Sequence, residues 1–122
     1  MLEIISKGDA QMSDERLIHD MMLDYLVKRL SKDYREINVN PSGDPDLVLG
    51  NHGLVLAHLD IETEATVTPE KAERWKKTAQ SGTKLILMVP KNSKMKVMEL
   101  LWQKGLADKV GVGSYEIQVQ MP

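Results

Sequence analysis

The stretch that decides the fold runs from Gly43 to Thr63 and reads GDPDLVLGNHGLVLAHLDIET. Two apolar runs, Asp46–Gly50 and Gly53–Thr63, flank a short glycine-containing turn, a pattern typical of a β-hairpin. Both runs also contain acids, although buried strands rarely carry unpaired charge. These acids are Asp46, Asp60 and Glu62. The stretch therefore predicts a hairpin that gathers carboxylates at one end.

The faces of the hairpin follow from the alternation of side chains along a strand. Asp60 and Glu62 are two residues apart, so we expect them to lie on one face. Asn51 and His52 suit the centre of a type I turn, and Gly53 suits the left-handed position that follows. We therefore predict a three-residue connection with a glycine bulge.

This connection would pair Gly50 with Leu54. In that register Asp46 lies opposite His58 and diagonal to Asp60. Diagonal neighbours on one face of a sheet are roughly 7–8 Å apart. Two carboxylates at that spacing can hold one cation between them.

A divalent cation would relieve the repulsion between three clustered carboxylates. Oxygen ligands and a chain without cysteine favour Mg²⁺ or Mn²⁺ over zinc. The alternative is that Asp46, Asp60 and Glu62 only decorate the solvent-exposed end of a hairpin.

The rest of the chain predicts one α/β domain that spans residues 1–122. Periodic or capped segments predict helices at 13–31, from Pro69 to near Gly82, and from Asn92 or Ser93 to about Lys104. Apolar or alternating runs predict further strands at 34–39, 84–89 and 115–120. The order α-β-β-β-α-β-α-β implies a mixed sheet with helices on both faces.

Composition and charge indicate which classes of protein the chain can belong to. The apolar fraction is 42%, there is no cysteine, and no apolar run is long enough to span a membrane. We therefore expect a soluble, cytoplasmic protein with no membrane partner. Residues 1–63 carry six Lys and Arg against twelve Asp and Glu, whereas residues 64–110 carry ten against five. A basic half beside an acid-rich half can bind a polyanion if the acids hold cations.

The pair Pro45-Asp46, a hairpin and then Asp60-Ile61-Glu62 resembles the signature of the PD-(D/E)xK, or restriction-endonuclease-like, nucleases. That superfamily has an α-β-β-β-α-β core, which is similar to the order predicted for residues 14–89. The resemblance implies that Asp46 and Asp60 bind Mg²⁺ or Mn²⁺. Its third motif position is usually Lys, but here it is Glu62. Glu62 would then be a ligand or the base, unless Lys76 or Lys77 replaces the missing lysine or the site is inactive.

The resemblance also implies an acid from the first helix, and Glu15 is the candidate. The alternative for Glu15 is an acid that only interacts with the helix dipole. His58, opposite Asp46 in the predicted register, would be a hydrogen-bond partner of a ligand carboxylate. We expect His19 to be packed and His52 to be exposed at the turn. Both tryptophans, Trp75 and Trp102, are predicted to lie in the core.

The predicted activity is metal-dependent hydrolysis of phosphodiester bonds in nucleic acid, with DNA as the expected substrate and a homodimer as one possible assembly. Six basic residues could contact the nucleic-acid backbone: Lys71, Arg74, Lys77, Lys91, Lys94 and Lys96. One alternative is a nucleic-acid-binding or assembly module on the same fold without catalysis. Another is an unrelated small α/β interaction domain.

Overall fold

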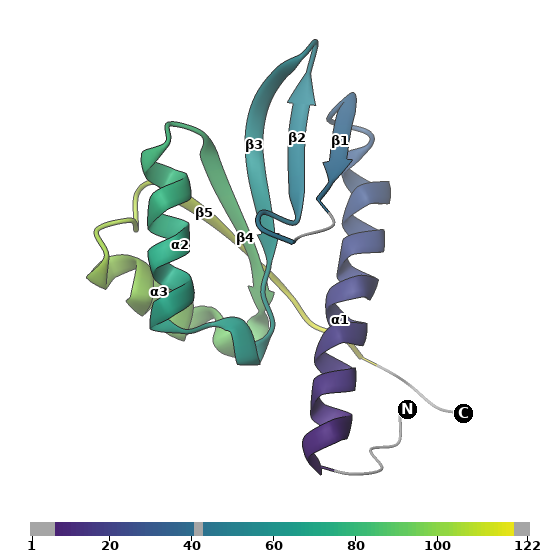
Figure 1. Cartoon of the computed structure of the whole chain (residues 1–122), viewed down its shortest axis with the longest axis vertical. Helices are drawn as coiled ribbons and strands as arrows, with labels where there is room; N and C mark the ends of the chain where they lie inside the picture. Colours follow the sequence, from purple (N-terminus) through teal and green to yellow (C-terminus); the bar gives the residue numbers. More distant parts are fainter. Residues whose placement is uncertain (1–6, 41–42, 119–122) are drawn as a thin grey trace.

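A five-stranded mixed sheet forms the centre of the molecule, and three helices pack against it (Figure 1). The structure is a computed structural model that describes residues 7–40 and 43–118, with side chains described from Glu15 onward. The strands are β1 (Glu36–Val39), β2 (Leu47–Asn51), β3 (Leu54–Ile61), β4 (Lys84–Pro90) and β5 (Val110–Tyr115). The helices are α1 (Lys7–Leu30), α2 (Pro69–Gln80) and α3 (Lys94–Gln103), with short 3₁₀ turns η1 (Glu64–Thr66) and η2 (Lys91–Ser93).

The sheet has the order β1-β2-β3-β4-β5. Strands β1, β2 and β3 form an antiparallel meander, whereas β3, β4 and β5 run parallel to one another. The parallel neighbours are joined through α2 and α3, as parallel connections require. The predicted α/β class and the order of elements are confirmed.

Each face of the sheet has its own core, which confirms that helices cover both faces. On one face, Leu87 of β4 packs in a cluster with Trp75 of α2 and Leu101 of α3. On the other face, Met88 of β4 packs against a cluster that contains Met22 of α1. Alternate residues of β4 therefore contribute to opposite cores, as its nearly continuous apolar sequence predicts.

The hairpin differs from the prediction at its turn. Asn51 pairs with Leu54, so the loop contains only His52 and Gly53. Both loop residues have positive φ, 53° and 79°, as a type I′ turn requires. The predicted three-residue connection is therefore wrong. The type I′ turn matches the right-handed twist of the two strands better than a type I turn does.

The bulge lies inside the ladder instead of at the turn. The register shifts between Leu49, which pairs with Ala57, and Gly50, which pairs with Val55. A Cβ atom on Gly50 would lie 2.4 Å from the Leu54 carbonyl oxygen, so the close approach of the two strands requires glycine here.

The shifted register changes the neighbour of Asp46 but not its face. Val48 pairs with His58 and Leu47 pairs with Leu59, so the expectation that His58 lies opposite Asp46 is wrong. Continuing this register places Asp46 opposite Asp60. The predicted and observed pairings differ by two residues, and a shift of two keeps every side chain on its original face.

Two element boundaries also differ. Helix α1 begins at Lys7 rather than at Ser13 or Asp14, whose side chains lie outside the described part. The last strand is Val110–Tyr115 rather than 115–120, while residues 116–118 have no regular structure and 119–120 are not described. The sequence pattern did not predict this strand, because glycines interrupt its apolar residues. A Cβ atom on Gly113 would lie 2.5 Å from the Met88 sulfur, so glycine makes room for that side chain.

Helix α2 begins where the sequence predicts. Pro69 is its first residue, and the Thr68 hydroxyl accepts a hydrogen bond from the Lys71 backbone N–H at 3.1 Å. This cap fixes Lys71 in the first turn of α2, immediately after the segment that leaves β3. Within the described residues, no helix combines the length and the apolar composition needed to cross a bilayer.

Candidate functional site

Three buried acids meet at the end of the β2–β3 hairpin that lies away from its turn. Asp46 precedes β2, Asp60 is the penultimate residue of β3, and Glu62 follows β3. Their exposed fractions are only 4%, 2% and 1%. The Asp46 N–H donates to Asp60 Oδ1 at 3.0 Å, and the Ile61 N–H donates to Asp46 Oδ2 at 2.7 Å. Side chain and backbone thus lock the two aspartates together.

His19 of α1 holds the other oxygen of Asp46. Its Nε2 atom lies 2.8 Å from Asp46 Oδ1, a hydrogen bond between α1 and the start of β2. This hydrogen bond raises the pKa of His19, and the charge of Asp46 acts in the same direction. The interpretation of His19 as merely packed is wrong, because it is a polar partner of a buried acid.

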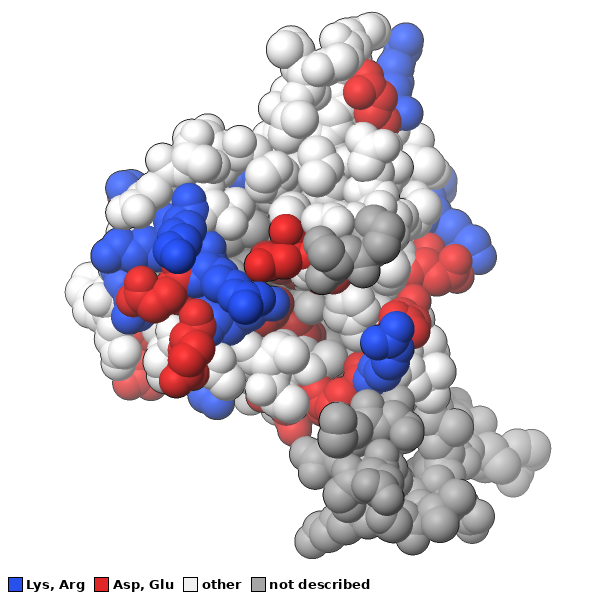
Figure 2. All heavy atoms as spheres, in the orientation of Figure 1, with Lys and Arg blue, Asp and Glu red and all other residues white. Residues whose placement is uncertain are grey.

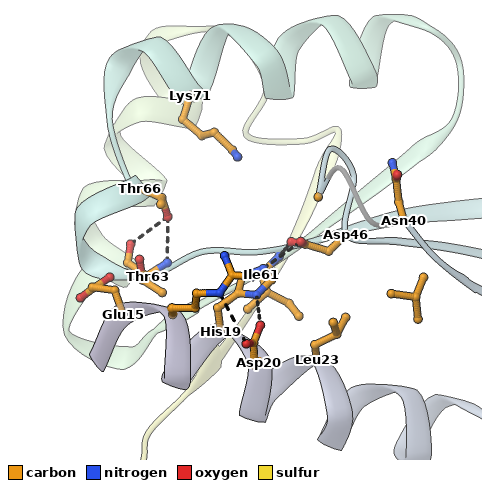
Figure 3. A pocket seen from close by; sticks show the side chains of 13 residues that line it. Glu15, His19, Asp20, Leu23, Asn40, Asp46, Ile61, Thr63, Thr66 and Lys71 are labelled. Carbon is orange, nitrogen blue, oxygen red and sulfur yellow. Dashed lines mark hydrogen bonds and ion pairs between the residues drawn. The ribbon is translucent and has the colours of Figure 1, made fainter. Parts of the chain in front are cut away.

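Lys71 of α2 reaches the third acid. Its Nζ atom lies 3.6 Å from Glu62 Oε1, and only 19% of its side chain is exposed. Figure 3 shows this side chain extending from α2 across the cleft toward Asp46. Lys71 is one of the residues predicted to contact the nucleic-acid backbone, and in the structure it lies beside the acids. Lys76 and Lys77 form no ion pair with the acids within the described residues.

Burial makes two of these carboxyl groups weak acids. The pKa of Asp60 is raised to about 6, mainly by loss of solvation and also by the charge of Asp46, against the lowering effect of the hydrogen bond from the Asp46 backbone. Burial also raises the pKa of Glu62 to about 8, against the opposing effect of the Lys71 charge. The Thr66 side chain also lowers the pKa of Glu62, but no hydrogen bond of normal geometry joins them. Glu62 is therefore largely protonated at neutral pH when only the protein surrounds it.

The side chains at this site are of the types that bind a cation, but they are not already arranged around one. Among the described residues, no group of three or more His, Asp and Glu side chains is arranged to hold a metal ion. Both oxygens of Glu62 are nevertheless buried without a hydrogen-bond partner in that part of the chain. A buried carboxylate that accepts no hydrogen bond is costly even beside the Lys71 charge, and a cation that takes oxygen ligands would reduce this cost.

An open cleft leads from solvent to Asp46. It has a volume of about 470 Å³ and lies between α1 and the start of α2 (Figure 3). Asp46 and Lys71 line it, whereas Asp60 and Glu62 do not. Glu15 also lines it, and its carboxylate accepts a hydrogen bond from the Ala65 N–H at 3.4 Å. Glu15 lies in the third turn of α1, so it is a wall of the cleft and not a first-turn acid.

The remaining predicted residues lie outside this cluster. His58 is half-buried on β3, and its Nδ1 atom has no hydrogen-bond partner among the described residues. Arg74 pairs with Asp44 at 3.3 Å, and Lys91 pairs with Glu116 at 3.4 Å. Figure 2 shows that basic side chains gather on the side of the molecule that carries α2, with acids among them. The other basic candidates are exposed: Lys77, Lys94 and Lys96.

The two tryptophans have opposite environments. Trp75 is fully buried, as predicted. Trp102 is 76% exposed, so its assignment to the core is wrong. Helical spacing did not separate the two faces of α3, because both faces carry apolar residues. His52 is exposed at the turn, as predicted.

His19 and Lys71 were not recognised as partners of the acids, although weak signals were available. His19 lies four residues after Glu15, and residues with that spacing share one helix face. Lys71 lies two residues after the helix-initiating Pro69, close to the end of the strand that carries Asp60. Only the packing of α1 and α2 against the sheet brings these residues together.

Comparisons with known proteins identified no relative of the chain. No family model matches the chain, and neither the curated proteins nor the solved structures contain a match. The nuclease interpretation therefore depends on the residues and on the geometry alone.

Proposed function

We propose that the protein is a metal-dependent nuclease that hydrolyses phosphodiester bonds, with DNA as the substrate. One observation carries the proposal. Asp46, Asp60 and Glu62 are brought together in buried positions at one end of a hairpin, with Lys71 3.6 Å from Glu62. Burying three acids beside one another is unfavourable for folding, so a chemical role explains the cluster better than stability does.

The architecture supports the same proposal. The order α1-β1-β2-β3-α2-β4 agrees with the order that the resemblance to restriction-endonuclease-like nucleases implies, and α3 and β5 follow it. Asp46 stands before the second strand and Asp60 at the end of the third, as in the resemblance stated above. The departure is Glu62 in the position of the usual lysine. Lys71, from the next helix, supplies a cation close to that position.

Each residue has a role that follows from its contacts. A Mg²⁺ or Mn²⁺ ion held by Asp46 and Asp60 would stabilise charge on the phosphate and activate water. Glu62 would complete the ligand set or accept a proton, and Lys71 would oppose the negative charge that develops on the phosphate. His19 holds Asp46 in place through its hydrogen bond, so it positions a ligand.

A nucleic-acid-binding or assembly module without catalysis is the second candidate. Two observations favour it: no metal-holding group is preformed in the described residues, and both oxygens of Asp46 already accept hydrogen bonds. A binding module of this kind would bind nucleic acid without any response to divalent ions.

Cleavage of a panel of single-stranded, duplex and branched DNA with Mg²⁺ or Mn²⁺ separates the two candidates. Asp60→Asn should abolish cleavage while the circular dichroism spectrum and the melting temperature show an intact fold. Lys71→Met should slow cleavage about 100-fold. Lys77→Met is the matched control, because it removes an exposed lysine from the same helix, and it should change the rate less than about threefold. Activity that persists in Asp60→Asn would contradict the proposal.

A further inference from the structure

The outer face of α3 carries large apolar side chains that no described part of the chain covers. Met95 is 81% exposed and Trp102 is 76% exposed, with Met98 between them at 37%. Their spacing of three and four residues places them in one stripe about 10 Å long. The opposite face of α3 is buried in the core through Val97 and Leu101. The helix therefore cannot rotate to hide the stripe.

Two lysines flank the Met95 end of the stripe. Lys94 and Lys96 are exposed beside it, and neither forms an ion pair with another described residue. Glu99 is the one acid of α3, so the helix carries a net positive charge. Lys94 and Lys96 lie about 9–12 Å along the helix axis from Trp102, at the Met95 end of the stripe. An exposed aromatic ring and unpaired lysines on one helix can bind single-stranded nucleic acid, because a base stacks on the ring while the lysines contact phosphates further along the strand.

We propose that the Met95–Trp102 stripe of α3 is a binding surface for single-stranded nucleic acid, with Trp102 as the base-stacking platform. The proposal rests on the proposed nuclease function and adds a substrate class to it. No residue of α3 lines the cleft at the acids, so the stripe would be a separate contact for the strand.

Other occupants fit the stripe less well. Three side chains supply only a few hundred Å², whereas a stable protein interface buries roughly 800 Å² on each partner. An antiparallel pairing of two copies through this stripe would also bring Glu99 of each copy together at its centre, which is unfavourable. A membrane-bound helix inserts a broad apolar face, but here the acid Glu99 is exposed on the same side as Met95 and Trp102.

Tryptophan fluorescence provides a direct test, because the chain has two tryptophans and Trp75 is fully buried. The wild-type protein is titrated in a chelator with a 12-nucleotide oligothymidylate and with a duplex of the same length. We expect quenching of the exposed tryptophan by the single strand and little change with the duplex. Oligouridylate should quench equally, since stacking and phosphate contacts do not read the 2′-hydroxyl.

Variants then show which side chains contribute to the affinity, which is measured by the fluorescence anisotropy of a labelled oligothymidylate. Trp102→Ala should weaken binding about tenfold, and Trp102→Phe should stay within about threefold of wild type because phenylalanine can stack. Tyr25→Ala is the matched control, since Tyr25 is an exposed aromatic residue on α1, and its affinity should not change. Replacing Lys94 and Lys96 by Gln should reduce the salt dependence of binding.

Several results would overturn the proposal. Equal affinity of Trp102→Ala and wild type, or equal quenching by duplex, would remove the stacking role. A spectral shift with anionic lipid vesicles but not with oligonucleotide would assign the stripe to a membrane surface. If sedimentation experiments show a dimer that Trp102→Ala converts to a monomer, the stripe is an interface with a second copy of the chain. Binding that depends on Trp102 without metal-dependent cleavage would refute the nuclease function but not the binding surface.

Discussion

Glu62 is a buried acid whose environment makes the stability of the protein depend on pH. It is buried, both of its oxygens lack a hydrogen-bond partner in the described chain, and its pKa is raised to about 8. A carboxyl group with a higher pKa in the folded state than in the unfolded chain binds protons more tightly when folded. The free energy of unfolding must therefore fall as the pH rises between the two pKa values.

We predict that the metal-free protein loses stability between about pH 4.5 and pH 8, by at most about 1.4 kcal/mol per pH unit from this group. Glu62→Gln should remove most of the slope above pH 6 and should be more stable than wild type at pH 8. Below pH 6, Asp60 contributes in the same direction, since its pKa is raised to about 6. Urea unfolding in a chelator from pH 5 to pH 9 measures these slopes.

The matched control for this measurement is Glu70→Gln, which removes an exposed acid in the first turn of α2. Its pH dependence should follow that of the wild-type protein. If Glu62→Gln has the same slope as wild type, burial of Glu62 does not determine the pH dependence.

At the residue scale, the sequence predicted the acids but not their partners. Asp46, Asp60 and Glu62 stood out because charge at the ends of apolar strands is unusual. His19 and Lys71 did not stand out, since a histidine or lysine on an amphipathic helix is common. Their roles depend on how α1 and α2 pack against the sheet, which no local pattern specifies.

The β2–β3 hairpin is the element that sets the geometry of the acids. Its register depends on a bulge at Gly50, where a side chain would collide with the backbone of the opposite strand. Gly53 also has a left-handed conformation, but a Cβ atom there would meet no other atom within 4 Å. Glycine is therefore required at position 50 to avoid a collision, and is favoured at position 53 because of the positive φ.

We predict that Gly50→Ala lowers the free energy of unfolding by about 2 kcal/mol or more, because the strands must separate to admit the methyl group. Gly53→Ala should cost only about 1 kcal/mol, the strain of a positive φ without a collision. Chemical unfolding of the two variants at one pH makes the comparison. Equal costs for the two variants would show that the bulge does not depend on glycine.

Elements with a strong local pattern were predicted well, and those without one were not. β4 and α2 have clear apolar periodicity, and their boundaries agree closely with the prediction. β5 was misplaced because Gly111 and Gly113 interrupt its apolar pattern, whereas the alternating residues after it resemble a strand. The turn type was also wrong, since His52 adopts a positive φ that favours Asn or Gly.

The whole molecule has two hydrophobic cores and one cluster of buried acids between the helices that cover them. The α1 core and the α2–α3 core lie on opposite faces of the sheet, and the acids lie where α1 and α2 approach the same strand ends. An ion that binds there would link both helices to the sheet and would bind only the folded protein. Such binding stabilises a protein by mass action.

We predict that Mn²⁺ or Mg²⁺ raises the melting temperature, with a gain of about 2.7 kcal/mol at an ion concentration 100 times the dissociation constant. The effect should be larger at pH 8 than at pH 5, because protons on Asp60 and Glu62 compete with the ion. Asp46→Asn should remove the response, whereas Asp44→Asn, which changes an exposed neighbouring acid, should retain it. Differential scanning fluorimetry measures both, and no response to either ion would favour the module without catalysis.

The global arrangement was more predictable than the local details. The order of helices and strands implied a mixed sheet covered on both faces, since parallel neighbours need crossover helices. The exposure of Trp102 was not predictable, because an apolar residue on an amphipathic helix normally faces the core.

The separation between the turn and the acids has a practical consequence for engineering the chain. Asp46 and Asp60 are aligned by the pairing of Leu47 with Leu59, while His52 and Gly53 lie at the far end of the hairpin, which projects from the body of the molecule (Figure 1). An epitope tag or a dye-labelled peptide spliced between His52 and Gly53 would lengthen only the projecting tip. That tip is therefore the natural attachment point for a reporter that leaves the carboxylates in register.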